Sequence, residues 1–400
     1  MKHQPLSKLA DIQTGPFGSQ LHKEDYVLIG TPIVTVEHLG NRVFTEQNLP
    51  RVKAEDKVRL AKYVLRTGDI VFSRVGSVDR CSYVDERHDG WMFSGRCLRV
   101  RPSKEIDPLY LYYYFCREET KQFIRNIAVG ATMPSINTKL LGEVEITFPD
   151  ITEQRKIAEL LSAIDDKIEL NTAINDNLAL QMQAIWSNLF LSGMESGTKV
   201  SLGDHLYVKG RIGWKGLKKE EYLSESPYRI INGESLTASG IDWDKAGFIS
   251  EDRYKESPEI MLQVGDILIS KDGTIGKVGY VDRLEKPTSV ASGIFVVRNL
   301  KPEAVSTIFI YCLLTSSYFK EFIASRTEGS VIPHLYQKDF VTLEIPLLSR
   351  EQLQLFDNTV TPLFNAYFDN QQENLRLAEL RDALLPRLMS GDIAVSDVQI

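Results

Sequence analysis

The sequence predicts two α/β (α+β) modules in tandem, alternating with two long helices that pair as an antiparallel coiled coil. The first observation is an apolar heptad pattern, free of proline and glycine, that runs from Glu153 to about Phe190. The second is an internal repeat, because the two halves of the chain resemble each other at a shift of 197–199 residues. One long helix in each half allows antiparallel pairing, with a pseudo-twofold axis relating the halves.

Composition sets the broad class of the protein. With 400 residues, 43% hydrophobic and 25% charged, the chain is typical of a globular protein of two or three domains. We expect a cytoplasmic location, because no secretory h-region and no apolar run long enough for a bilayer are found. The four cysteines lack CxxC spacing and are expected to be free thiols, with no metal site. The net charge of −7 argues against nonspecific nucleic-acid binding, so DNA contact would need basic residues clustered on one face.

Residues 1–150 form the first predicted module. Strands are expected at residues 33–36, 69–73, 82–84, 97–100 and 143–148, separated by glycine-containing turns. Pro108 starts a predicted helix that ends before Gly130. Its aromatic residues Tyr110, Tyr113 and Tyr114 lie at helical spacing, which favours core packing over base stacking.

The first long helix is assigned to residues 151–193. Steps of four and three residues define its pairing positions, which are Ile157, Leu161, Ile164, Ile168, Asn171, Asn175, Leu178, Met182, Ile185 and Leu189. Asn171 and Asn175 interrupt the apolar stripe near its middle. Two interpretations stay open: a solvated patch where the partner helix is absent, or polar core residues that fix the register of the pair.

The repeat defines the second module, which with its linker spans residues 194–348. Leu65–Asp85 matches Leu262–Asp282 at a shift of 197, and the glycine, proline and lysine of GATMPSINTK (Gly130–Lys139) recur in GSVIPHLYQK (Gly329–Lys338) at a shift of 199. Identity, spacing and order persist together over nearly the whole half-chain. The pattern therefore indicates duplication of one folding unit.

Residues 349–400 form the second helical region and the C-terminal tail. Pro362 is expected to separate a short helix at residues 350–361 from a new helix that begins with Thr361 as N-cap and runs to about Met389. Pro386 is expected to distort the last turn. The pairing positions are Phe364, Tyr367, Leu375, Ala378, Leu385 and Leu388.

No catalytic motif is found in the sequence. Gly273–Gly279 lacks the hydroxyl residue of a phosphate-binding loop, and the histidines form no HExxH pair. There is no NPPY-type loop of an adenine methyltransferase. The acidic PDITEQR segment is interpreted as a helix start, capped by Asp150 or Thr152. The chain is therefore predicted to be a non-catalytic protein with no catalytic and no metal-binding residues.

The chain resembles the specificity (S) subunit of a type I restriction-modification system. The resemblance lies in EQRKIAELLSAIDDKIELN after the first module, LRDALLPRLMSGDI near the C-terminus, and the GDI block and G-x-x-x-P loop found in both halves. It implies two target recognition domains that read the two halves of a bipartite double-stranded DNA target. It also implies helices that set the gap and dock two methyltransferase (M) subunits, with restriction (R) subunits in the full complex. No cofactor is expected in this subunit, whereas S-adenosylmethionine, ATP and Mg are expected in its partners.

Candidate DNA-binding residues lie on the predicted strand-turns and G-x-x-x-P loops. In the first module they are Arg74, Ser77, Arg80, Thr132, Ser135, Asn137 and Lys139, and in the second Arg211, Lys215, Lys271, Thr274, Lys277, His334, Tyr336 and Lys338. Lys139 and Lys338 are equivalent in the repeat, so phosphate contact is expected for both. Base contacts should differ between modules, which singles out Asn137 against Tyr336 and Ser135 against His334. For each of these, a solvated loop residue is the alternative interpretation.

Two other functions remain open from sequence. One is a protein–protein scaffold with two adaptor heads that binds no DNA. The other is an enzyme whose active site is not recognisable in the sequence. DNA binding of the assembled complex tests the first, and turnover by the isolated chain tests the second.

Overall fold

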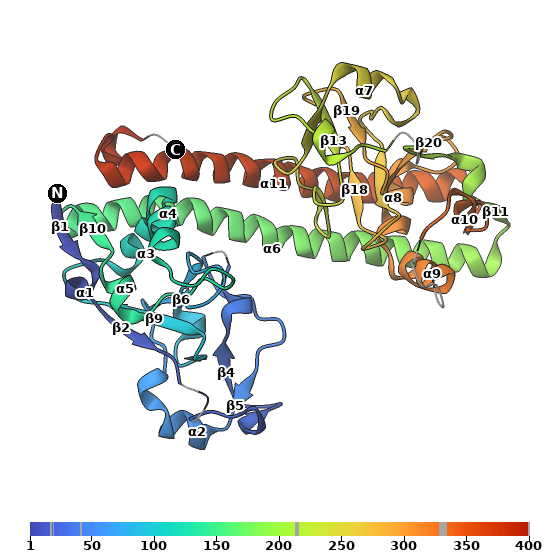
Figure 1. The fold of residues 1–400 in the computed structure, drawn as a ribbon. Coiled ribbons are helices and arrows are strands. Elements are labelled where there is room, and N and C mark those ends of the chain that lie inside the picture. The colour runs from blue at the N-terminus through green and yellow to red at the C-terminus, as the bar shows by residue number, and fades with distance from the viewer. Residues whose placement is uncertain (17, 19, 41, 213–215, 328–333, 399–400) are drawn as a thin grey trace. The chain divides into compact units, whose positions relative to one another are not determined.

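The computed structural model describes residues 1–400 except 17, 19, 41, 213–215, 328–333 and 399–400 (Figure 1). The chain divides into two compact units. Unit 1 comprises Met1–Leu170 and Glu373–Ile400, and unit 2 comprises Asn171–Gln372. The long helices α6 (Ile151–Ser196) and α11 (Arg350–Ser390) each contribute one part to each unit. These units divide both helices, whereas the boundaries expected from sequence at residues 150, 193 and 348 keep them separate from the modules.

Unit 1 is built around an antiparallel sheet in the order β2-β9-β6-β7 and a smaller sheet in the order β3-β5-β4-β8, in which β4 and β8 are parallel. Its strands are β1 Lys2–Pro5, β2 Ala10–Thr14, β3 Tyr26–Val27, β4 Thr31–Val34, β5 Arg51–Val52, β6 Ile70–Ser73, β7 Cys81–Tyr83, β8 Met92–Phe93, β9 Cys97–Pro102 and β10 Glu145–Phe148. Its shorter α-helices are α1 Leu6–Leu9, α2 Ala54–Arg59, α3 Pro108–Cys116, α4 Glu118–Ile127 and α5 Thr138–Gly142. The 3-10 helices are η1 Lys23–Asp25, η2 Val36–His38, η3 Ala61–Tyr63, η4 Glu86–His88 and η9 Val395–Asp397.

The prediction of a single helix from Pro108 to a point before Gly130 is wrong, because the structure has two helices there, α3 and α4. Arg117 takes an extended conformation (φ −62°, ψ 136°) and ends α3 before α4 begins. The break allows α3 to bury six of its nine residues while α4 keeps an exposed face. Tyr110, Tyr113 and Tyr114 are buried in the core, which confirms their interpretation as packing residues.

Unit 2 repeats this construction with a sheet in the order β12-β20-β17-β18 and a second sheet in the order β16-β13-β19. Its strands are β11 Lys199–Ser201, β12 Leu206–Gly210, β13 Tyr228–Ile231, β14 Leu236–Thr237, β15 Gly240–Ile241, β16 Gly247–Ile249, β17 Ile267–Ser270, β18 Val278–Tyr280, β19 Thr288–Val290, β20 Ile294–Asn299 and β21 Glu344–Pro346. Its shorter helices are η5 Leu202–His205, η7 Lys219–Glu221, α7 Glu251–Lys255, η8 Pro258–Ile260, α8 Thr307–Thr315, α9 Ser317–Thr327 and α10 Gln337–Val341.

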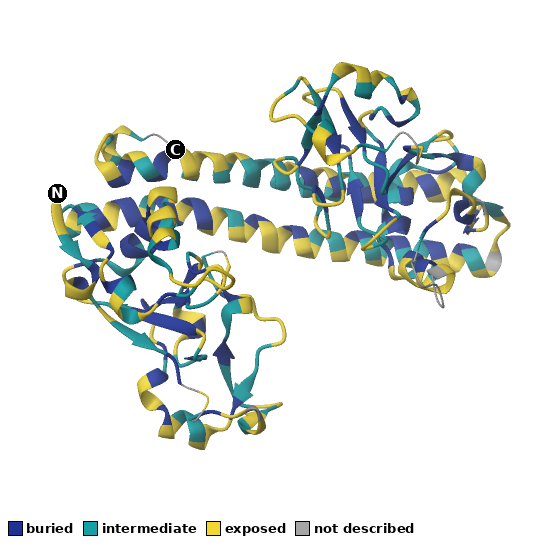
Figure 2. Cartoon of the chain, viewed as in Figure 1, coloured by how far each residue is buried: buried dark blue, intermediate teal, exposed yellow. Residues whose placement is uncertain are grey.

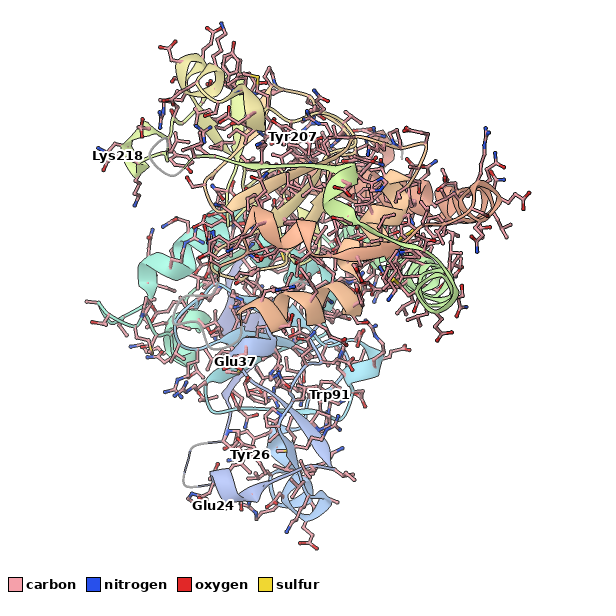
Figure 3. The ribbon with its side chains drawn as sticks, turned by 90° about the vertical axis from the view of Figure 1, so that its right-hand side faces the viewer. Glu24, Tyr26, Glu37, Trp91, Tyr207 and Lys218 are labelled. Atoms are coloured by element: carbon pink, nitrogen blue, oxygen red, sulfur yellow. The ribbon has the colours of Figure 1, made fainter. Side chains whose placement is uncertain are left out.

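The duplication seen in the sequence is confirmed by a buried ion pair that occurs once in each unit. Arg101 donates to both carboxylate oxygens of Asp69, at 2.7 and 2.6 Å, and to the carbonyl of Val64. Arg298 binds Asp266 in the same way at 2.6 and 2.7 Å. Its guanidinium carbon lies 5.6 Å from the ring centre of Tyr207, a residue that is labelled in Figure 3. Each pair joins two neighbouring strands of the central sheet, so the repeat preserves a contact that orients the sheet core.

The two long helices pack together antiparallel within each unit. In unit 1, Ile157, Leu161 and Ile164 of α6 share a core with Leu385 and Leu388 near the end of α11. In unit 2, the later part of α6 shares a core with the first part of α11, through Met182, Trp186, Phe190, Phe356, Val360 and Phe364. Figure 2 shows buried positions recurring along both helices. The remaining predicted positions, Ile168, Leu178, Ile185, Leu189, Tyr367, Leu375 and Ala378, are half-buried.

Asn171 and Asn175 are buried, with exposed fractions of 1% and 7%. The Asn175 side chain donates to the carbonyl of Tyr367 at 2.9 Å and accepts a hydrogen bond from Asn370 at 2.9 Å. Both partners lie on α11. The structure therefore decides between the two interpretations in favour of polar core residues, since a hydrogen-bonded amide at the seam disfavours other registers.

The break expected at Pro362 is wrong, because α11 is continuous from Arg350 to Ser390 and also passes through Pro386. Pro362 lies on the exposed face, between the buried residues Val360 and Phe364. Its ring removes one backbone hydrogen bond, at a cost of about 3 kcal/mol. Asn358, whose carbonyl loses that donor, is exposed, so water can replace it. Burial of the opposite face outweighs the remaining cost.

Three smaller findings complete the fold. Helix α6 extends to Ser196, so the segment expected as a linker from residue 194 begins within the helix. Asp150 caps α6, because its carboxylate accepts hydrogen bonds from the backbone N–H groups of Thr152 and Glu153. All four cysteines are free thiols, as expected. Among the residues that the structure describes, no helix is both long enough and apolar enough to span a membrane.

Candidate nucleic-acid interface

In unit 1, the turn between β6 and β7 and the loop at residues 129–137 are joined by backbone hydrogen bonds. The N–H of Gly76 donates to the carbonyl of Pro134 at 2.8 Å, and the N–H of Ile136 donates to the carbonyl of Arg74 at 3.0 Å. Val129 and Ser135 exchange two further backbone bonds, at 2.9 and 2.8 Å, which close the loop at its base. We call this element the turn–loop pair of unit 1.

Two glycines allow this backbone path. Gly76 and Gly130 have φ angles of +76° and +104°, a region that side chains with a Cβ atom rarely adopt. A Cβ at Gly130 would also lie 2.7 Å from the carbonyl oxygen of Met133. The repeated glycines that sequence analysis noted are therefore required for the shape of the turn–loop pair.

The predicted DNA-binding residues of unit 1 lie on this turn–loop pair or directly after it, but their side chains differ in solvent exposure. Ser77, Arg80, Thr132 and Lys139 are exposed. Arg74 is half-buried and donates to the carbonyl of Gly95 at 3.0 Å, and the Ser135 hydroxyl donates to the carbonyl of Val129 at 3.2 Å. Asn137 is the N-cap of α5, where its side-chain oxygen accepts the N–H of Leu140 at 2.9 Å. That oxygen already has a structural role, which the spacing of the motif did not reveal.

Unit 2 has the described part of this backbone arrangement, between the turn that joins β17 to β18 and the residues from His334 onward, and we call it the turn–loop pair of unit 2. The N–H of Leu335 donates to the carbonyl of Lys271 at 3.1 Å, and the N–H of Lys271 donates to the carbonyl of Gly293 at 2.9 Å. The latter bond matches that from Arg74 to the carbonyl of Arg96 in unit 1. Lys215, together with Pro333 of the second G-x-x-x-P loop, lies outside the described residues.

The side chains on the unit 2 turn form an aromatic and basic group. His334 Nδ1 pairs with the carboxylate of Asp272, and its ring centre lies 4.6 Å from that of Tyr336. The Lys338 ammonium lies 5.3 Å from the Tyr336 ring centre. Thr274, Tyr336 and Lys338 are exposed, so hydroxyl, phenol and ammonium groups are accessible together.

Two lysines of unit 2 are also engaged within the protein. The Lys277 ammonium donates to the carbonyl of Gly233 at 3.2 Å, and the Lys271 ammonium lies 5.1 Å from the Phe295 ring centre. Neither contact buries the charge fully, because both side chains remain half-exposed. Both can therefore contribute positive potential at the turn.

Arg211 does not belong to this surface, and its assignment as a DNA-binding residue is corrected. Its exposed fraction is 2%, and its guanidinium donates to the carbonyl of Val290 at 3.2 Å. It also donates to the hydroxyls of Ser257 and Ser289, at 3.5 and 3.4 Å. Burial lowers the pKa of Arg211. Arg211 directly follows β12, and nothing in the sequence around it distinguishes a buried arginine from one on an exposed loop.

Sequence reasoning missed two basic residues near these turns. Arg96 is exposed, and its carbonyl accepts the hydrogen bond from Arg74. Lys320 is exposed and lines a cavity of about 370 Å³ in unit 2, together with Thr274 and Lys277. KQFI in the first half recurs as KEFI in the second, so Lys320 is equivalent to Lys121 in the repeat. This recurrence could have identified Lys320 as a candidate from the sequence.

The interface has a composition suited to binding rather than to catalysis. Hydroxyl, amide, imidazole and cationic groups can contact phosphates and base edges. In the part of the chain that the structure describes, no three His, Cys, Asp or Glu side chains are grouped so as to hold a metal ion.

The chain belongs to a known family of DNA-specificity proteins. Residues 4–180 and 201–356 match the type I restriction modification DNA specificity domain. The chain is therefore a member of the type I restriction-modification specificity subunit family. Members of this family are non-catalytic, and the catalytic activities belong to other subunits.

Individual relatives agree with this assignment. The chain is 28% identical over 317 residues to the type I restriction enzyme MjaIX specificity subunit of Methanocaldococcus jannaschii, covering 75% of this chain and 72% of that protein. It is 24% identical over 427 residues to the HindI specificity subunit of Haemophilus influenzae, covering 88% and 92%. The crystal structure of a type I restriction-modification S subunit from M. genitalium has the same fold, with a TM-score of 0.59 and 21% identity over 97% of this chain and 95% of that one.

Proposed function

We propose that this chain reads a bipartite double-stranded DNA target, with one turn–loop pair contacting each half. The observation that supports the proposal most strongly is the same backbone construction carrying different side chains. At equivalent positions, Ser135 is replaced by His334, and Asn137 by Tyr336. A shared backbone positions the two units on DNA in the same way, while different polar side chains select different bases.

Charge, in contrast, is retained between the two units. Arg74 corresponds to Lys271, Arg80 to Lys277 and Lys139 to Lys338. Retention of a cation without retention of arginine geometry suits a phosphate, because a bidentate base contact distinguishes arginine from lysine. We therefore assign these three pairs to the phosphate backbone.

The long helices are proposed to set the gap between the half-sites and to dock two methyltransferase (M) subunits, with restriction (R) subunits joining the full complex. Their contribution to both units supports the first role. Exposed leucines on their outer faces in unit 2, at Leu180 and Leu191 of α6 and Leu355 of α11, support the second. S-adenosylmethionine, ATP and Mg would be bound by the partner subunits.

A binding selection tests the recognition role. The chain, assembled with its methyltransferase subunits, would be offered a pool of randomised duplexes, and bound DNA would be sequenced after a mobility shift. We expect two conserved words separated by a constant, unconserved gap. Binding without sequence preference would contradict the proposal and favour the protein scaffold.

An insertion experiment tests the role of the helices in spacing. One heptad would be inserted into α6 between Leu170 and Asn171, and a second into α11 between Gln372 and Glu373. Both insertions are needed because each unit contains a segment of both helices. We expect a longer gap with both words unchanged. An unchanged gap in the selected DNA would contradict the role of the helices, whereas the recognition role would stand.

A further inference from the structure

The loop of unit 1 exposes apolar side chains among its polar ones. Met133 has an exposed fraction of 63% and Val129 of 55%, and Pro134 between Met133 and Ser135 is also exposed. Exposed methionine and proline side chains at the end of a loop gain nothing from folding of the unit itself. Their place in the candidate interface indicates contact with a ligand.

This loop is fixed in place before any ligand binds. The paired backbone bonds of Val129 and Ser135 close it at its base, and the bond from Gly76 to the carbonyl of Pro134 ties its end to the β6–β7 turn. Ile136, which follows directly, is buried with an exposed fraction of 1%. A constrained backbone loses little conformational entropy on binding, so Met133 and Pro134 are presented in a preorganised form.

The charges around the loop identify the ligand as a polyanion. Arg74, Arg80 and Lys139 lie on the same turn–loop pair or directly after it. The nearby acidic residue Asp79 is neutralised by Arg125, with an N–O distance of 2.5 Å. An apolar tip on an element that also carries cations suits a DNA duplex, whose base steps are apolar and whose edges are lined by phosphates.

We propose that Met133 and Pro134 form an apolar wedge that enters between two base pairs of the half-site read by unit 1. Insertion of an apolar side chain partly unstacks a base step and bends the duplex, and the cations that flank the wedge then reach more phosphates. Because flexible pyrimidine–purine steps open most readily, the wedge selects sequence without touching base edges. This inference rests on the proposed DNA-recognition function and concerns unit 1 only.

Fluorescent base analogues in DNA test the wedge. Duplexes would carry 2-aminopurine or pyrrolocytosine, whose fluorescence rises on unstacking, at one position of the selected target at a time. The full chain with its methyltransferase subunits would then be added. We expect a rise at the adenine to be methylated, since methyltransferases extrude their target base. We expect a second rise at one other step, in the half-site read by unit 1.

Three variants complete the experiment. Met133→Ala should abolish the second rise and weaken binding about 10-fold, because part of the insertion is lost. Met133→Leu should preserve both, and Val58→Ala, an exposed apolar residue on α2, should behave as the unaltered chain. Retention of the second rise in Met133→Ala, or its absence from the unaltered complex bound to its target, would overturn the wedge and leave the recognition role intact. Failure of the complex to prefer any sequence would overturn both.

Discussion

The two units solve the same packing problem with different chemistry where the module meets the long helices. In unit 1 the centre of this contact, around Asp165 of α6, is polar. The Tyr113 hydroxyl donates to Asp165 of α6 at 2.7 Å, and Arg381 of α11 donates to the other oxygen of Asp165 at 2.7 Å. Arg42 pairs with Asp166 and donates to the Ser162 hydroxyl at 2.9 Å. The hydrogen bonds of Asp165 thus join the module to both helices, and those of Arg42 add a second contact with α6.

In unit 2 the corresponding position, around Phe364 of α11, is aromatic. The ring centres of Tyr280 and Phe364 lie 4.9 Å apart, those of Tyr311 and Phe364 5.3 Å apart, and those of Phe364 and Phe368 4.7 Å apart. The second and third strands of each central sheet nevertheless keep the Asp–Arg pair that joins them. The two halves of the repeat therefore share the geometry of the module but differ in the side chains that contact the long helices. A polar network fixes geometry, whereas an aromatic cluster contributes more through burial.

Removal of the central ring of the aromatic cluster should have the largest effect. Phe364→Ala is expected to lower the free energy of unfolding of unit 2 by about 3–5 kcal/mol, because it removes a buried ring and leaves a cavity. Amide hydrogen exchange of α8 reports this locally. Phe123→Ala, at an exposed position in unit 1, is the control. Equal protection of the α8 amides in Phe364→Ala and in the unaltered protein would show that the aromatic cluster does not stabilise unit 2.

Neutralising the centre of the polar network should cost less. Asp165→Asn is expected to destabilise unit 1 by about 2–3 kcal/mol, because two hydrogen bonds to a charged acceptor are weakened while the shape is kept. Exchange of α3 amides measures the effect, with Glu159→Gln, at an exposed position of α6 in unit 1, as control. A larger loss in Glu159→Gln than in Asp165→Asn would contradict the role given to the buried carboxylate.

These two contacts show what the sequence could and could not predict. Local periodicity and the repeat predicted the long helices, their antiparallel pairing and the two modules, because those depend on patterns within one segment. The continuity of α11 through Pro362, the break at Arg117 and the burial of Arg211 depend on packing between segments distant in sequence. The capping role of Asn137 was missed because the short helix α5 has too few residues to show a period.

Alkaline pH should affect both units through their buried tyrosines. Burial, together with the charge of Asp165, raises the pKa of Tyr113, and burial raises the pKa of Tyr311. Above about pH 10 the unfolded chain releases phenolic protons that the folded chain retains, so stability falls as pH rises, by about 1.4 kcal/mol per pH unit for each tyrosine.

Phenylalanine variants separate the two contributions. The free energy of unfolding, measured by denaturant titration, should decrease less between pH 10 and 11 in Tyr113→Phe and in Tyr311→Phe than in the unaltered protein. The exposed Tyr336→Phe should leave it unchanged. The same slope in all four proteins would show that these tyrosines do not control the alkaline response.

The smallest effects are expected at the shared phosphate contacts. Lys139→Ala and Lys338→Ala should each weaken DNA binding by the assembled complex equally for all sequences. Each should also reduce the slope of log K against log salt by about 0.9, because one fewer counterion is released. Salt titrations of binding measure both slopes. A change in the selected sequence would instead assign the lysine to a base.

The most direct test of the account maps methylated adenines in the genome of a host that carries the full system, with the residues at one repeat position exchanged. The unaltered chain should give two words with a constant gap. Ser135→His in unit 1 should alter one word and His334→Ser in unit 2 the other, with the gap unchanged. A single continuous word, or a change in both words from either substitution, would contradict the claim that each half of the chain reads its own half of the target.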